Sequence, residues 1–264
     1  MFKEIIKHTI RSDMAIIVLG YPYQPYTDCG LDAYYLATQE MYKECKQIQN
    51  QLQSAGAHAR IVNDVSLRDL SFKSGLATIL GVNQMAMRPD CGSWLVLAAI
   101  ETDFLDTVQQ AKTHLVDKVD KCIDCGECVR CCPTGAIGIN GEFYAEKCLR
   151  SYQCGDVMPI QIAELMGKRF LGCDICQVVC PHNFHIEPIS PPQFVTQALK
   201  NCVYTIAPFK DIIGTNYARA KYLTVNSIVY SANALNRDAI QGIKELAKDE
   251  KYSEMAQWAL KKLQ

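Results

Sequence analysis

The spacing of apolar residues predicts three strands in the first 120 residues. Residues 14–20 form a short run rich in β-branched side chains, and the Pro-rich stretch 21–26 (YPYQPY) ends it, so we expect a buried strand that runs into a loop. Residues 59–63 and 93–103 show similar features and predict two further strands. The first part of the chain is therefore expected to contain a sheet.

Helical spacing occurs between these strands. From Leu31 to about Ala55 apolar positions recur every three or four residues, and Gly56 follows as a stop, which predicts one long amphipathic helix. Ser66 is a suitable N-cap for a short helix that ends at Gly75. Helices and strands together predict an α+β fold class, with a mixed domain over the first 120 residues.

The rest of the chain divides into two parts with different patterns. Residues 121–190 contain many glycines and little apolar periodicity, so something other than a core must order them. After the Pro-rich stretch 187–194 the pattern is helical, and short connections between helices favour antiparallel hairpins. We expect domains over 1–120, 121–190 and 191–264, with helices over 216–235, 237–249 and 253–263.

The composition is that of a globular protein. The chain has 264 residues, of which 49% are apolar and 21% charged, enough for a sizeable buried core. The apolar run at 14–20 is too short to cross a membrane and lacks the layout of a signal peptide, so we expect a cytoplasmic protein without a membrane partner. Residues 191–264 carry 10 basic and 6 acidic side chains. That surplus is compatible with a nucleic-acid partner, and equally with a solvated helix surface.

Cysteine is frequent and concentrated in two runs. The chain has 14 cysteines, and in a reducing cytosol they favour a metal site or catalysis over disulfides. The stretch CIDCGECVRCCP (122–133) matches the C-x2-C-x2-C-x3-C-P spacing of two-cluster ferredoxins, in which the fourth cysteine binds the other cluster. The stretch CDICQVVCP (173–181) repeats the second half of that spacing. The two runs predict two 4Fe-4S clusters.

A count of ligands narrows the assignment. Two cubane clusters need eight thiolates and the two runs supply seven, so Cys148 or Cys154 must be the eighth. We predict Cys148, with Cys154 as the alternative. The predicted ligands of the first cluster are Cys122, Cys125, Cys128 and Cys180. Those of the second cluster are Cys132, Cys148, Cys173 and Cys176.

Structural zinc is the alternative interpretation, because zinc also favours C-x2-C pairs on short turns. Zinc sites seldom use the longer run with a second Cys-Pro return, so we prefer iron-sulfur clusters. Apolar residues near the runs would shield the clusters, namely Ile123, Val129, Ile137, Ile175, Val178 and Val179. The remaining cysteines are expected to be buried packing residues, namely Cys29, Cys45, Cys91, Cys131 and Cys202.

The sequence resembles the epoxyqueuosine reductase family. The likeness rests on CGECVRCCPTGAI (125–137), Cys148 and MGKRFLGCDICQVVCPHN (166–183), together with DLSFKSGLA (69–77) and GSWLVLAAIETD (92–103). The cluster spacing alone is shared with many ferredoxin-like proteins, whereas its combination with the upstream GSW block is much more specific.

This resemblance implies a fold, a reaction and two kinds of cofactor. The fold would comprise a nitroreductase-like α/β domain that binds cobalamin, a ferredoxin-like domain with two 4Fe-4S clusters, and HEAT-like helical repeats. The reaction would be the reductive removal of the epoxide oxygen of epoxyqueuosine in tRNA, the last step of queuosine synthesis. The electron donor would be a low-potential ferredoxin or flavodoxin.

The resemblance also implies site residues, with departures from the family pattern. The family's GRDYH motif is GLDAYY (30–35) here, and its G-L-G-x-x-G-K-N motif is GLATILGVN (75–83). Reductive cleavage of a carbon–oxygen bond requires a proton donor, and Asp64 is the nearest counterpart of the family's aspartate, an exposed turn residue being the alternative. The implied cobalamin contacts are Tyr21, Tyr23, Gly75, Gly81, Asn83, Gly92, Ser93 and Trp94. For the two tyrosines, packing on the sheet is the alternative.

Two other functions remain open on sequence alone. The same cofactors would serve a reductase of a small molecule, as in reductive dehalogenases. Alternatively, the chain would be a two-cluster electron-transfer protein that binds no corrinoid. Cobalamin binding separates this last function from the other two.

Overall fold

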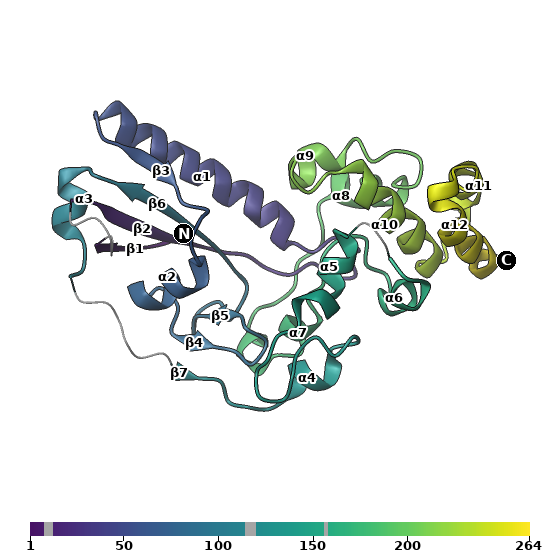
Figure 1. Ribbon diagram of the computed structural model, residues 1–264, viewed down its shortest axis with the longest axis horizontal. Helices are drawn as coiled ribbons and strands as arrows, with labels where there is room; N and C mark the ends of the chain where they lie inside the picture. Colours follow the sequence, from purple (N-terminus) through teal and green to yellow (C-terminus); the bar gives the residue numbers. More distant parts are fainter. Residues whose placement is uncertain (8–12, 114–119, 156–157) are drawn as a thin grey trace.

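The computed structural model describes residues 1–7, 13–113, 120–155 and 158–264. It is elongated, with a sheet at one end, the cysteine-rich segment in the middle and a group of helices at the other end (Figure 1). Within these ranges no helix combines the length and the apolar character that a membrane span requires. The mixture of helices and strands expected from the sequence is confirmed.

A four-stranded antiparallel sheet forms the N-terminal part. Helix α1 (Tyr34–Ser54) packs on one face of this sheet and helix α2 (Leu67–Ser74) on the other. The sheet order is β1 (Phe2–Lys7), β2 (Ala15–Pro22), β6 (Leu95–Thr102) and β3 (Ala59–Ile61).

Strand β2 is buried on both of its faces. Ile17 and Leu19 pack in the apolar cluster that includes α1, whereas Ile16 and Val18 pack in the cluster on the α2 side. Because helices cover both faces, the strand is a continuous apolar run rather than an alternating one. This explains why residues 14–20 were recognisable as a buried strand.

The predicted long and short helices of this part are confirmed. Helix α2 begins after Ser66, whose hydroxyl accepts a hydrogen bond from the Asp69 amide at 3.2 Å. It ends at Gly75, which has a φ of 74°, a left-handed conformation that glycine adopts without strain. Strand β1 was not predicted, because its sequence FKEIIK has neither a continuous apolar run nor strict alternation.

Short elements lead from the sheet to the cysteine-rich segment. Helix α3 (Leu105–Gln110) follows β6. A small three-stranded sheet has the order β5 (Ala86–Met87), β4 (Ile79–Leu80) and β7 (Asp120–Lys121). Strand β7 leads directly into the first cysteine run, so the small sheet fixes where that run begins.

The cysteine-rich segment consists of short helical pieces joined by loops. Helix α4 packs against α7, so the two cysteine runs lie side by side although about forty residues separate them. The described pieces are α4 (Glu127–Cys131), η1 (Ala145–Lys147), α5 (Leu149–Gln153), α6 (Ile160–Leu165), α7 (Ile175–Val178) and η2 (Pro181–Asn183).

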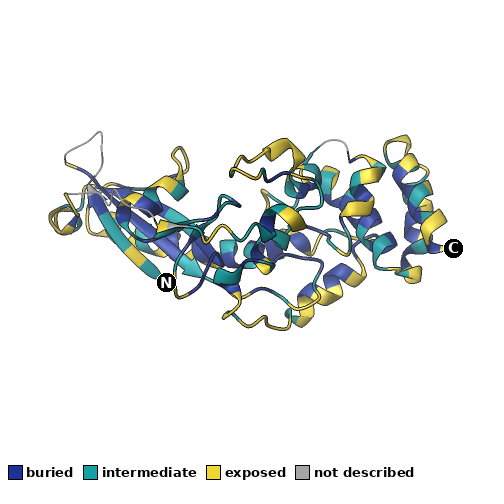
Figure 2. Ribbon diagram, turned by 90° about the horizontal axis from the view of Figure 1, so that it is seen from below, coloured by how far each residue is buried: buried dark blue, intermediate teal, exposed yellow. Residues whose placement is uncertain are grey.

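The C-terminal part is helical, as expected. Helix α12 packs against both α10 and α11 around a shared apolar core, and Figure 2 shows the buried sides of these helices turned toward one another. Helices α8 and α9 were not predicted from the sequence. The elements are α8 (Gln193–Lys200), α9 (Phe209–Ile213), α10 (Ala220–Asn233), η3 (Arg237–Ala239), α11 (Ile240–Leu246) and α12 (Glu250–Leu263).

Candidate metal centre

Four cysteines line one cavity in the cysteine-rich segment. The volume of this cavity, here called the cluster cavity, is about 120 Å³, whereas a single water molecule needs only about 10–15 Å³. Its wall also includes the apolar side chains of Ala136, Ile137, Leu149 and Ile175. The four cysteines are Cys132, Cys148, Cys173 and Cys176. They are the residues predicted to bind the second cluster.

Two thiols of the cluster cavity, those of Cys173 and Cys176, are difficult to ionise without a compensating cation. Burial raises the pKa of Cys176, and the neighbouring thiolates of Cys173 and Cys148 raise it further. Burial also raises the pKa of Cys173 to about 11. Because the metal ligand is the thiolate, a positively charged iron cluster would supply the compensation that these thiols lack.

Cys132 is prepared for ionisation by its own loop. Burial would raise its pKa, but hydrogen bonds from the following residues lower it. The Ala136 amide donates to the Cys132 Sγ at 3.3 Å, and the Thr134 hydroxyl lies 3.7 Å from the same sulfur. Hydrogen bonds of this kind stabilise a thiolate and tune a bound cluster.

The other four predicted ligands form a second group. Burial raises the pKa of Cys180, and the thiolates of Cys122, Cys125 and Cys128 raise it further, so the four sulfurs share one environment. Cys128 and Cys180 are buried, whereas Cys122 and Cys125 are half-buried. Cys128 also acts on Cys176, which indicates that the two groups are neighbours.

A single metal ion and a cubane cluster make different demands on the positions of their ligands. Within the described ranges, no three His, Cys, Asp or Glu side chains converge closely enough to hold one metal ion. A zinc ion needs its thiolates at about 2.3 Å from one point, whereas a cubane cluster carries its ligands on four separate irons. The four cysteines that line the cluster cavity would bind a cubane in this way, one thiolate to each iron.

The structure separates the two candidates for the eighth ligand. Cys148 precedes α5 and lines the cluster cavity. Cys154 follows the same helix, is exposed, and has a pKa that burial raises and Arg150 and Arg219 lower, with no contribution from a cluster cysteine. Cys148 therefore lies with the other ligands and Cys154 does not, although the ligand set itself stays a prediction.

The remaining cysteines differ in burial. Cys45, Cys91 and Cys202 are buried, as expected, and Cys29 is half-buried. The expectation is wrong for Cys131, which is exposed. Cys131 is the last residue of the short helix α4, after which the chain turns into the loop of Cys132.

The apolar residues predicted to shield the clusters differ in their positions. Ile137 and Ile175 line the cluster cavity. Ile123 and Val178 are exposed by 58% and 53%, so they do not shield it. The apolar shell comes instead from Ala136 and Leu149, which the spacing of the cysteines did not indicate.

The GSW block joins the sheet to the cysteine-rich segment. The Gln177 side-chain amide donates to the Ser93 carbonyl and hydroxyl oxygens at 2.9 and 3.1 Å. Gly92 has a φ of 56°, and a Cβ there would lie 1.9 Å from the Asn183 Oδ1. Trp94 is buried and meets the ring of Tyr23 edge-on at a centroid distance of 5.7 Å.

The other predicted cobalamin residues also occupy packed positions. Tyr21 and Tyr23 pack on the apolar cluster between the sheet and α1. The Asn83 side chain lines the cluster cavity and donates to the Cys176 carbonyl oxygen at 3.0 Å. A Cβ on Gly81 would meet Asn83, and Gly75 ends α2. Their role toward a corrinoid stays a prediction.

Asp64 lies at the surface. Its carboxylate pairs with Arg60 at 3.2 Å, and its side chain is 60% exposed. The hydrogen bond from Arg60 lowers its pKa, so the carboxyl is ionised at neutral pH. An ionised, exposed carboxylate matches the turn-residue interpretation, and the role of Asp64 as proton donor stays a prediction.

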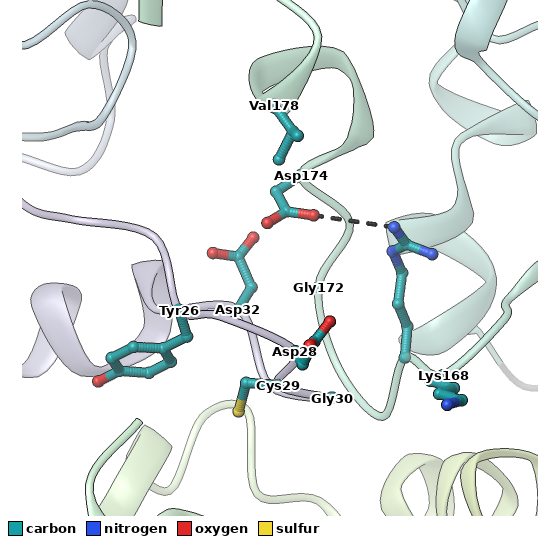
Figure 3. Close-up of a pocket in the computed structure, with 10 residues that line it drawn as sticks. Tyr26, Asp28, Cys29, Gly30, Asp32, Lys168, Gly172, Asp174 and Val178 are labelled. Carbon is teal, nitrogen blue, oxygen red and sulfur yellow. Dashed lines mark ion pairs between the residues drawn. The ribbon is translucent and has the colours of Figure 1, made fainter. Parts of the chain in front are cut away.

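A second aspartate, Asp32, lines a polar cleft. Figure 3 shows the carboxylates of Asp32 and Asp174 facing one another across this cleft, whose volume is about 480 Å³. Arg169 pairs with Asp174 at 4.0 Å. Burial and the charge of Asp174 raise the pKa of Asp32 to about 6, close to the range in which a general acid works.

Asp32 was not among the site residues predicted from the sequence. The Tyr34 amide donates a hydrogen bond to the Asp32 Oδ1 at 2.9 Å, so the Asp32 side chain satisfies a backbone amide in the first turn of α1. An aspartate before a helix is expected as a helix cap, and that position gives no indication that it is buried. The sequence signal that could have indicated Asp32 was the GLDAYY stretch (30–35), which contains it. A neighbouring cavity of about 300 Å³ shares Tyr26 and Val178 with the cleft and is lined by Trp94.

Known proteins resemble this chain in sequence. Residues 121–183 match the family model of the 4Fe-4S double cluster binding domain. The epoxyqueuosine reductase of Lactococcus garvieae is 31% identical over 219 residues, which cover 73% of this chain and 57% of the relative. That of Listeria monocytogenes is 28% identical over 198 residues, 69% of this chain and 50% of the relative. The chain thus spans about half the length of these curated relatives.

A solved structure has the same fold. The structure of epoxyqueuosine reductase from Streptococcus thermophilus superimposes with a TM-score of 0.70 and 22% identity, covering 95% of this chain and 73% of that one. The resemblance drawn from the sequence motifs is confirmed, and so is the double-cluster segment.

Proposed function

We propose that this chain is an iron-sulfur reductase of the epoxyqueuosine reductase type, which removes the epoxide oxygen of epoxyqueuosine in tRNA. The observation that carries the proposal is the cluster cavity with its four cysteines, beside a second group of four, in a chain with the fold of these enzymes. A solved epoxyqueuosine reductase holds an epoxyqueuosine-modified tRNA-Tyr stem loop, which supports tRNA as the substrate.

The two cysteine groups match the electron demand of this reaction. Removal of an epoxide oxygen as water consumes two electrons and two protons and leaves a carbon–carbon double bond. Each 4Fe-4S cluster carries one electron, so two clusters deliver the pair in single steps. Electrons from a ferredoxin or flavodoxin in the cytoplasm would enter the chain at one of the two clusters.

Three functional parts follow the domain boundaries. Residues 1–120 would form the nitroreductase-like corrinoid domain, in which helices cover both faces of the sheet. Residues 121–190 would form the ferredoxin-like domain. Residues 191–264 would form the beginning of a HEAT-like array, which the packing of α12 on α10 and α11 supports.

The cleft and the neighbouring cavity suit cobalamin. They offer apolar surface from Trp94, Phe184 and Val178, and charged groups from Asp32 and Arg169, which match the faces and the amide side chains of a corrin ring. A bound cobalamin would supply a cobalt centre that passes the electrons to the epoxide. The GSW block would then act by holding the domains on either side of the cleft together.

The required protons need a buried acid within reach of the cleft. Asp32 has a raised pKa and lines the cleft, whereas Asp64 is exposed and ionised. We therefore place Asp32 ahead of Asp64 as the proton source. Replacing each aspartate by asparagine distinguishes the two candidates. Only replacement of the true proton donor should abolish turnover while iron content and cobalamin binding persist.

The decisive experiment is sequential. Protein reconstituted anaerobically is expected to hold about eight iron per chain and to bind cobalamin. With a strong reductant it should then convert epoxyqueuosine in tRNA to queuosine. Iron without cobalamin binding would indicate an electron-transfer protein, and cobalamin binding without conversion of the tRNA would indicate a small-molecule reductase. Zinc in place of iron would overturn the proposal.

A further inference from the structure

Arg150 connects the cluster cavity with the N-terminal part of the chain. It lies in α5, two residues after Cys148, and lines the cluster cavity. Its guanidinium lies over the ring of Tyr34, with the Cζ 4.8 Å from the centroid, and over that of Tyr35, at 5.5 Å. Both tyrosines belong to the first turn of α1. The Arg150 side chain therefore contacts residues of the N-terminal part of the chain, outside the cysteine-rich segment to which it belongs.

The charge of Arg150 is permanent. Burial alone would lower its pKa, but Tyr35, Asp32 and Tyr34 raise it above the ordinary value. Arginine is charged at every pH at which the protein folds. Among the described residues that line the cluster cavity, Arg150 is the one cationic side chain.

A fixed cation at this place acts on the cluster electrostatically. Reduction adds one negative charge to a 4Fe-4S cluster, and a nearby positive charge in a poorly solvated site stabilises the reduced form. Groups packed around metal ligands tune the properties of the bound metal in this way. Among the described residues, the arginine beside the first cysteine group is Arg130, which is exposed, donates to the Cys125 carbonyl oxygen at 2.9 Å and pairs with Glu127.

We propose that Arg150 raises the reduction potential of the cluster bound by Cys132, Cys148, Cys173 and Cys176 above that of the other cluster. Electrons that the first cluster receives then move energetically downhill to the second, which lies nearer α1 and the cleft. This inference rests on the two clusters of the proposed function, and not on cobalamin or tRNA. Arg150 thus acts on the second cluster through its positive charge and not as a ligand.

The test is a redox titration of the reconstituted full chain, followed by electron paramagnetic resonance without cobalamin or tRNA. Arg150→Met should shift the potential of the second cluster to a more negative value and leave the first unchanged. Arg150→Lys should retain most of the wild-type value. Cys148→Ser assigns the signals, since it alters a ligand of the second cluster alone.

The matched control is Arg130→Met, which also removes one positive charge near a cysteine run. Because Glu127 and solvent already compensate Arg130, the second cluster should keep its potential. Unchanged potentials in Arg150→Met with full iron content would overturn the proposal, as would an equal shift of both clusters.

A second variant covers the case in which Arg150→Met loses iron. Asp32→Asn removes the anion that opposes Arg150 without touching the cluster cavity, so it should shift the second cluster to a more positive potential. A potential that stays in place would contradict the inference. Since these measurements need neither cofactor nor substrate, failure of tRNA conversion would count against the proposed function alone.

Discussion

Ser93 and Asn183 hold one another through a reciprocal pair of hydrogen bonds. The Ser93 amide donates to the Asn183 Oδ1 at 2.8 Å, and the Asn183 Nδ2 donates to the Ser93 hydroxyl oxygen at 2.8 Å. Asn183 also donates to the Gln177 carbonyl oxygen at 2.7 Å. Both residues are buried, so the joint between the sheet and the second cysteine run is a polar network without water competition.

Asn183→Ala should loosen this joint. The substitution leaves the buried Ser93 amide and hydroxyl without partners, which costs about 1–3 kcal/mol for each unsatisfied group. The free energy of unfolding, measured anaerobically by denaturant titration, should fall accordingly. Asn201→Ala is the control, because Asn201 is exposed and makes one long bond to the Gln197 carbonyl oxygen. A loss no larger than that of the control would show that the network contributes nothing.

Gly92→Ala should destabilise the chain more than Gly135→Ala. Both glycines have positive φ, 56° and 63°, so both substitutions carry a similar backbone strain of about 1–2 kcal/mol. A Cβ at Gly92 would also lie 1.9 Å from the Asn183 Oδ1 and 2.7 Å from the His182 carbonyl oxygen, whereas nothing lies within 4 Å at Gly135. The difference in stability between the two variants, measured by thermal unfolding, gives the part of the destabilisation that is due to the steric clash. Equal losses would contradict the close packing at Gly92.

The cysteine runs were readable from the sequence because their geometry is local. Two-residue gaps bring thiols around one loop whatever the rest of the chain does. The choice between Cys148 and Cys154 was not local, because the residues flank opposite ends of one short helix. The tertiary packing of α5, which contacts η1 and α10, decides that Cys148 and not Cys154 lines the cluster cavity.

The contacts of the GSW block, in contrast, could not be predicted from the sequence. Its sequence identified a resemblance, and its residues were interpreted as cofactor contacts. In the fold, the Ser93 amide bonds to Asn183, ninety residues further along the chain, and Gly92 lies against the same side chain. Nothing in the spacing of the two stretches indicates that they meet, since such contacts depend on tertiary packing.

Cys148→Ala and Cys154→Ala should differ in iron content. Loss of Cys148 removes a thiolate from the cluster cavity, so the variant should retain about four iron per chain rather than about eight. Cys154→Ala and Cys131→Ala replace exposed thiols and should retain the wild-type content. Iron and sulfide analysis after anaerobic reconstitution checks this. Loss of iron in Cys154→Ala with a full complement in Cys148→Ala would reverse the assignment of the eighth ligand.

Asp32 should make stability depend on pH between its unfolded and folded pKa values. Its folded pKa is raised from 3.8 to about 6, so in this window the folded state binds more protons than the unfolded state. Stability therefore rises as the pH falls through 6, by about 1 kcal/mol between pH 7 and pH 5, and the gain is complete below pH 3.8.

Asp32→Asn removes the titrating group and should abolish this contribution. The informative quantity is the difference in unfolding free energy between wild type and variant, measured by denaturant titration at pH 7 and pH 5. The difference should move in favour of the wild type at the lower pH. Asp64→Asn should show no such change between these two pH values, because Arg60 lowers the pKa of Asp64 from 3.8 and the carboxyl stays ionised at both. A pH-independent difference for Asp32→Asn would mean that its carboxyl is not held in a buried, acidic environment.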